Sequence, residues 1–206
     1  MVKLNFNLAA FSFQGGLAIL AKSFASAIVA LNADVQNAKD EAFGYQQALE
    51  QGGEWIGETD ENGTVIWDQS QILDYEVDVV NEAAQELRKA FALALYHHWE
   101  RSARLWTQAD NWSHEQLVTA SLNRGYPIDP RLAAVRDLVN TLKHNKDRWG
   151  RDLVKSWPDV FPSDFVERPN RRTDWYEAIQ LSDTQVRDAF NIVAASGPTT
   201  DMLPST

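Results

Sequence analysis

The amino-acid sequence predicts an all-α protein: a helical bundle with long antiparallel helices and a small β-hairpin insertion. Two long segments repeat apolar residues at intervals of three and four, as amphipathic helices do. An Asn-Gly pair between two short β-prone runs predicts the hairpin that joins them. The 206 residues are 44% hydrophobic and 23% charged, which suits one domain with a buried core.

The first long helix is expected over residues 17–49, where Leu17, Leu20 and Phe24 begin an apolar stripe. Gly52 and Gly53 end it. The hairpin is expected at about residues 54–68, around Asn62-Gly63.

The second long helix is expected from Asp68 or Ser70 to about Trp106, with a kink or break because of its length. Its apolar stripe would comprise Ile72, Val79, Ala83, Leu87, Phe91, Leu95 and Leu105.

Shorter helices should follow. Ser113 with Gln116, and Ser182 with Gln185, form capping-box patterns that start helices ending near Leu122 and Gly197. Between them, we expect a helix that Asp129-Pro130 starts and that ends near His144. A loop over 145–150, a helix over 151–157 and an irregular connection over 158–172 complete the order. We expect one domain over residues 1–197 and a disordered tail over 198–206.

Composition excludes several classes of protein. With no cysteine, the chain has no disulfide framework, thiolate zinc site or cysteine nucleophile. We found no motif for a phosphate loop, a hydrolase elbow or a zinc protease, and we expect neither a metal nor a cofactor. No uninterrupted apolar run reaches about 18 residues, so we expect no membrane partner and a cytoplasmic location.

The net charge of −10 is unevenly distributed. Residues 1–87 hold 14 acidic and 3 basic side chains, whereas residues 88–206 are nearly neutral. Residues 131–155 carry 7 basic and 3 acidic side chains, including Arg148. This basic segment is either a solvated helix face or a phosphate-binding surface.

The basic segment contains a polar stripe along one helix face, formed by Arg136, Asn140, Lys143 and His144. Such a set can bind a phosphate, orient a hydroxyl and transfer a proton, with His144 as the acid or base. The alternative is that Lys143 and His144 only complement the negative end of the helix.

A second polar cluster lies near the end of the second long helix. His97, Glu100, Arg101 and Arg104 share one sector of this helix and should form an ion-pair network, which is either structural or functional. His98 lies on the apolar face and is expected to be a hydrogen-bonded core residue.

The segment from Val139 to His144 resembles a helix of HEPN-like domains, which are all-helical modules of bacterial toxins, abortive-infection proteins and some nucleases. A wider resemblance, to uncharacterised phage- and plasmid-type bacterial proteins, adds a helix with His97-His98-Trp99-Glu100 and the stretch Pro158-Asp159-Val160-Phe161. Val139 stands where the HEPN family has its signature arginine; Arg136 lies upstream.

The resemblance implies a homodimer that cleaves RNA without a metal, in a defence or toxin system. It implies Asn140 and His144 as catalytic positions and leaves the arginine role unassigned, with Arg101 or Arg104 of the neighbouring helix as candidates to supply it. Arg136 is not the family's arginine, but it is a candidate to bind phosphate as part of the polar stripe. Lys143 and Arg148 would help to bind the substrate, with His97 and Glu100 in support. The alternative is a non-catalytic interaction module of antitoxin or inhibitor type, whose acidic N-terminal half binds a protein partner.

Overall fold

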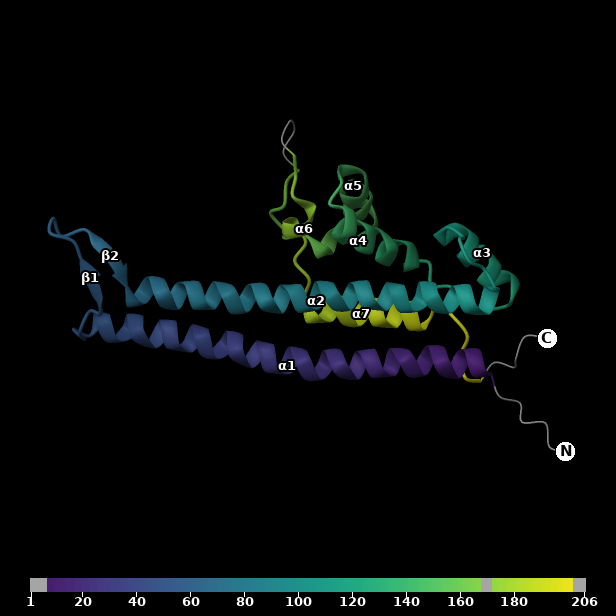
Figure 1. Ribbon diagram of the computed structural model, residues 1–206, viewed down its shortest axis with the longest axis horizontal. Helices are drawn as coiled ribbons and strands as arrows, with labels where there is room; N and C mark the ends of the chain where they lie inside the picture. The colour runs from purple at the N-terminus through teal and green to yellow at the C-terminus, as the bar shows by residue number, and fades with distance from the viewer. Residues whose placement is uncertain (1–6, 168–171, 202–206) are drawn as a thin grey trace. The chain divides into compact units, whose positions relative to one another are not determined.

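The computed structural model describes residues 7–167 and 172–201, and it confirms an all-helical fold with a small β-hairpin (Figure 1). In chain order, the elements are α1 (Leu8–Glu50), β1 (Gly57–Thr59), β2 (Val65–Asp68), α2 (Gln69–Thr107), α3 (His114–Asn123), α4 (Leu132–His144), α5 (Asp147–Ser156), a 3-10 turn (Pro158–Val160), α6 (Trp175–Ala178) and α7 (Asp183–Ala194).

The chain divides into two compact units. One unit is Ala25–Leu87, and the other combines the residues up to Phe24 with those from Arg88 onward. We name them the hairpin unit and the main unit. Both α1 and α2 therefore contribute to each unit.

In the hairpin unit, the β-hairpin connects α1 to α2, which run antiparallel (Figure 1). The Asp60 carboxylate accepts hydrogen bonds from the backbone N–H groups of Asn62 (2.9 Å) and Thr64 (2.8 Å). Gly63 has a φ of +82°, a conformation that glycine adopts without strain. The predicted hairpin is thus confirmed.

The core of the main unit forms around two fully buried tryptophans. Trp99 of α2 donates its indole N–H to the carbonyl of Ser196, at 2.5 Å. Trp175 donates its indole N–H to Asp147, at 2.9 Å. A Cβ added at Gly150 would lie 2.0 Å from the Trp175 ring, so this glycine lets α5 pack against the tryptophan. Helix α4 packs against α5, α6 and α7.

Local capping signals gave the starts of two helices correctly. Ser113 and Gln116 form a reciprocal capping box at the start of α3, and Ser182 and Gln185 form another at the start of α7. Helix α4 begins at Leu132 rather than at Pro130, because Asp129 accepts a hydrogen bond from the Arg131 backbone N–H (2.8 Å) within a turn.

Three expectations about the helices were wrong. Helix α1 begins at Leu8 rather than Leu17, and α2 continues without a break over 39 residues. The loop expected over 145–150 is only a turn, since α5 begins at Asp147. Asn145 makes this turn in a left-handed conformation (φ 47°), and its side-chain oxygen accepts a hydrogen bond from the Trp175 backbone N–H (2.8 Å).

The buried face of α2 also differs from the expected stripe. Leu95 is buried, but Leu105 is 74% exposed, and Ile72 and Val79 are exposed as well. The buried residues of α2 are instead Leu73, Ala84, Lys89, Ala92, Leu95, Tyr96, Trp99, Ala103, Trp106 and Thr107.

Two further expectations concern the chain ends and the membrane. Pro198, in the expected tail, is buried, and its carbonyl accepts a hydrogen bond from Gln14 (3.1 Å), while residues 202–206 lie outside the described residues.

Helix α1 contains an 18-residue window with a mean hydropathy of 1.6, of which 17% is buried. By length and composition alone this window is apolar enough to cross a membrane, so the absence of a membrane partner stays a prediction.

Candidate functional site

A cavity of about 250 Å³ lies where α2, the start of α3, and α4 meet in the main unit. Five residues of the predicted site line it: His97, Glu100, Arg136, Asn140 and Lys143. The other lining residues are Tyr96, Ser113, His114, Glu115, Val139 and Trp149. The structure therefore brings together part of each of the two polar clusters expected on separate helices, namely His97 and Glu100 with Arg136, Asn140 and Lys143.

Helix α4 presents Arg136, Asn140 and Lys143 of its polar stripe to this cavity because its opposite face is buried. Val135 and Leu138 are almost fully buried, as the apolar spacing predicts. Asn140 is half-buried, whereas Lys143 at the last turn is exposed. Within the described part of the chain, Lys143 has no ion-pair partner, so its ammonium group is available to an anion.

Four predicted site residues lie outside this lining. His144 and Arg148 are both exposed, and the Arg148 guanidinium lies 4.9 Å from the centre of the Trp149 ring. Arg101 and Arg104 instead line a cavity of about 760 Å³ between α1 and α2, together with His97 and Glu100. His97 and Glu100 thus contribute to both cavities.

Part of the network expected on α2 is present. His97 Nδ1 lies 3.6 Å from Glu100 Oε2, and Arg104 pairs with Glu100 at 2.9 Å. Arg104 also donates to the backbone carbonyls of Asp110 and Trp112, so it holds the segment that leads into α3. Arg101 forms no ion pair with the described residues. His98 stacks on Phe13 and is 2.9 Å from the Phe13 carbonyl oxygen, which confirms the expected core histidine.

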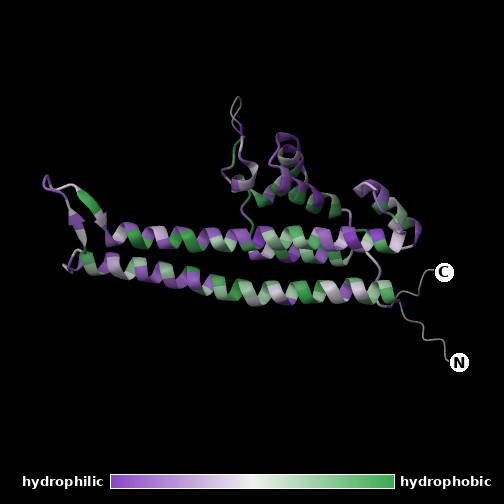
Figure 2. Cartoon of the chain, viewed as in Figure 1, coloured by the Kyte–Doolittle hydropathy of each residue, from purple (hydrophilic) through white to green (hydrophobic). Residues whose placement is uncertain are grey.

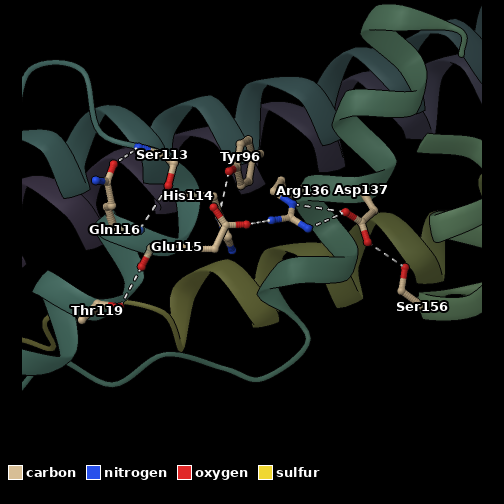
Figure 3. Close-up of polar contacts among 9 residues, drawn as sticks. All are labelled: Tyr96, Ser113, His114, Glu115, Gln116, Thr119, Arg136, Asp137 and Ser156. Carbon is tan, nitrogen blue, oxygen red and sulfur yellow. Dashed lines mark hydrogen bonds and ion pairs between the residues drawn. The ribbon is translucent and has the colours of Figure 1, made fainter. Parts of the chain in front are cut away.

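Arg136 is held between two carboxylates (Figure 3). It donates to Glu115 and, through Nε at 3.1 Å and Nη2 at 2.9 Å, to Asp137. Asp137 is buried and also accepts a hydrogen bond from Ser156 (3.2 Å). Burial alone would lower the pKa of Arg136, but Asp137 and Glu115 outweigh it and raise the pKa. The guanidinium is therefore charged, but its charge is already compensated.

His114, which was not among the residues expected at the site, pairs with Tyr96 beside this network (Figure 3). His114 Nδ1 and the Tyr96 hydroxyl oxygen lie 2.9 Å apart. Burial lowers the pKa of His114 to about 4, and the positive charge of Arg136 acts in the same direction. Burial, followed by the charge of Glu100, raises the pKa of Tyr96. The pair is therefore uncharged at neutral pH. Nothing in the local sequence marks His114 as a site residue, because it appears there only as the residue after the helix cap Ser113.

The His114 pKa gives a prediction for stability against pH. The unfolded chain binds a proton on this histidine near pH 6.5 and the folded protein only near pH 4. The contribution of neutral His114 to the free energy of unfolding is therefore fully present above pH 6.5 and is lost as the pH falls toward 4. We expect a loss of about 1–2 kcal/mol, reduced by solvent access to the half-buried ring.

Urea unfolding at pH 7 and pH 5 would measure this loss in the wild type and in His114→Gln. Glutamine does not titrate, so the variant should lose less stability than the wild type over this range. An equal loss in both proteins would show that folding does not lower the pKa of His114.

The described residues contain no group of three or more histidine, aspartate or glutamate side chains that could hold a metal ion. Comparisons of the chain with protein families, with curated proteins and with solved structures found no match. What the site can do therefore follows from its own side chains: a free ammonium group, an amide, an exposed imidazole beside a carboxylate, and an uncharged imidazole–phenol pair.

Proposed function

We propose that this chain is a HEPN-like protein of a bacterial defence or toxin system that cleaves RNA without a metal ion. One observation carries the proposal. The cavity between α2, α3 and α4 collects His97 and Glu100 from α2 with Asn140 and Lys143 from α4, four of the residues expected at the site, whereas His144 lies outside its lining. The lining of the larger cavity between α1 and α2 has imidazoles and arginines but no side-chain amide.

Cleavage of RNA by side chains alone needs proton transfer and charge stabilisation. An imidazole takes the proton of the ribose 2′-hydroxyl, and the 2′-oxygen attacks the adjacent phosphorus. The bond from phosphorus to the 5′-oxygen breaks, and a protonated group gives that oxygen a proton. The products are a 2′,3′-cyclic phosphate and a free 5′-hydroxyl, so no water, metal or cofactor is consumed.

Two solvent-accessible imidazoles are candidates for proton transfer: His97 lines the cavity, and His144 lies outside the lining at the end of α4. The side chain of His97 is 47% exposed, and its Nδ1 lies 3.6 Å from the Glu100 carboxylate. His144 follows Asn140 by one turn of α4 and is exposed at the helix end. We assign proton transfer to these two residues, with His144 as the primary acid or base.

Phosphate binding falls to Lys143 and Asn140. Lys143 lacks a carboxylate partner in the described part of the chain, whereas Glu115 and Asp137 neutralise Arg136. An unpaired cation beside a developing negative charge stabilises it most where solvent is partly excluded. Arg136 then has a positioning role, since it connects α4 to the start of α3. Arg101 and Arg148 remain candidates for contacts with neighbouring phosphates.

The test is incubation of the purified protein with a fluorescent oligoribonucleotide in the presence of EDTA. We expect cleavage to products ending in a cyclic phosphate, and no cleavage of the all-deoxy oligonucleotide, which lacks the attacking hydroxyl. Lys143→Gln should weaken RNA binding. The number of counterions released on binding, which the salt dependence of the affinity measures, should fall by about one.

Lys155→Gln is the matched control, since Lys155 is exposed on α5 and does not line the cavity. If the protein neither binds nor cleaves RNA, the proposal is wrong. If both lysine variants weaken binding equally, the bound RNA does not use this cavity.

A further inference from the structure

The hairpin unit carries an uncompensated negative charge. Residues 40–87 contain 13 acidic side chains and no lysine, arginine or histidine. None of the twelve from Asp40 to Glu82 forms an ion pair with a described residue. Like charges at this density repel one another and oppose the compact state, so their retention favours a use in binding.

The β-hairpin within this unit exposes large apolar side chains. Trp55, Ile56, Val65, Ile66 and Trp67 are between 37% and 59% exposed. Figure 2 shows β2 as a hydrophobic strand next to a hydrophilic β1 and turn. A cluster of exposed apolar residues bordered by charge is typical of a surface that binds another protein.

The hairpin also leaves strand edges unpaired. The sheet has only two strands, β1 and β2, paired antiparallel with Glu58 opposite Trp67. A two-stranded hairpin is marginally stable alone in water, and its edges can accept a further strand. Other contacts hold it in place: the Tyr45 hydroxyl accepts a hydrogen bond from the Ile56 backbone N–H (2.9 Å), and the Trp55 ring covers Gly57.

We propose that this hairpin binds an extended segment of a partner protein in which basic and apolar residues alternate. The segment would add as a strand, because no other described strand pairs with the edges of the hairpin. Its apolar side chains would cover Ile66 on one face of the hairpin, and its basic side chains would lie on the other face, where Glu58 sits opposite Trp67.

A second copy of the chain is a less suitable occupant. The basic segment at residues 131–155 belongs to α4 and α5, so it would have to unfold before it could add as a strand. The proposal is independent of RNA cleavage, since the hairpin residues and the cavity residues lie in different units.

The experiment uses the full chain and a defined probe, a fluorescent ten-residue peptide that alternates lysine and valine. Binding is followed by fluorescence anisotropy at low salt. A peptide of the same composition, with its five lysines and five valines in two blocks, controls for charge alone. We expect the alternating peptide to bind at least about tenfold more tightly than the block peptide, a difference of about 1.4 kcal/mol.

Three variants locate the binding surface. Ile66→Thr keeps a strand-forming residue and removes the apolar contact, so it should weaken the alternating peptide severalfold and leave the block peptide unchanged. Glu54→Gln with Glu58→Gln should weaken the alternating peptide about tenfold. Asp40→Asn with Glu41→Gln removes the same charge on α1 and should have a much smaller effect.

Three results would overturn the proposal. The first is equal binding of the two peptides, which would indicate attraction by charge alone. The second is an equal effect of the two paired variants, which would place binding over the whole acidic unit. The third is a wild-type dimer that Ile66→Thr converts to a monomer, which would identify the occupant as a second copy.

Discussion

Replacement of His144 by alanine is expected to lower the rate of RNA cleavage by about 10²–10⁴-fold, the contribution that a general acid or base makes. His144 is exposed at the end of α4, one turn beyond Asn140, and its side chain makes no ion pair with a described residue. The substitution should therefore leave the free energy of unfolding nearly unchanged. Single-turnover cleavage of the oligoribonucleotide, with a urea titration of the same sample, measures both quantities.

His97→Ala provides the matched comparison, since His97 lines the cavity itself. If both histidines transfer protons, each substitution removes one limb of the pH–rate profile. If His97→Ala alone lowers the rate, His144 has no catalytic role, although RNA remains the substrate. If both variants cleave at the wild-type rate, the reaction does not occur at this site.

The largest effect on stability is expected at Trp99. This side chain is fully buried, its ring centre lies 5.7 Å from that of Tyr96 and 5.4 Å from that of His114, and its indole N–H donates to Ser196. Trp99→Ala leaves a cavity and an unsatisfied carbonyl, so it should lower the free energy of unfolding by about 3–5 kcal/mol. Urea unfolding followed by circular dichroism measures the loss.

Two further variants test whether lost packing at Trp99 causes the destabilisation. Trp99→Phe keeps a ring and should cost clearly less than Trp99→Ala. Trp55→Ala removes a tryptophan that is 43% exposed on the hairpin, so it should have a small effect on unfolding. If Trp55→Ala and Trp99→Ala were equally destabilising, Trp99 would not be the core of the main unit.

Helix starts and the turn of the hairpin were predictable because their causes are local. The two capping boxes, at Ser113 and Ser182, satisfy backbone N–H groups with side chains at most three residues away. Gly63 supplies the positive φ that the hairpin turn requires. The polar face of α4 was likewise predictable, since Val135 and Leu138 mark the opposite, buried face.

The face that α2 buries was not predictable, since apolar residues occur on more than one side of this helix. Burial of Trp99, and exposure of Leu105, depend on where the C-terminal segment with Ser196 packs. The same holds for the turn at Asn145, whose left-handed conformation is supported by a hydrogen bond from Trp175, a residue far along the chain.

The helical class, the hairpin, and the candidate residues Asn140, Lys143 and His97 could be predicted from the sequence, because periodicity, caps and charge are properties of neighbouring residues. That these residues line one cavity, and that Asp137 and Glu115 neutralise Arg136, follows from the packing of α2, α3 and α4. The same packing brings in His114, whose pKa is lowered by burial against a helix distant in sequence. Burial and charge compensation come from segments that the chain brings together only on folding, so no local pattern records them.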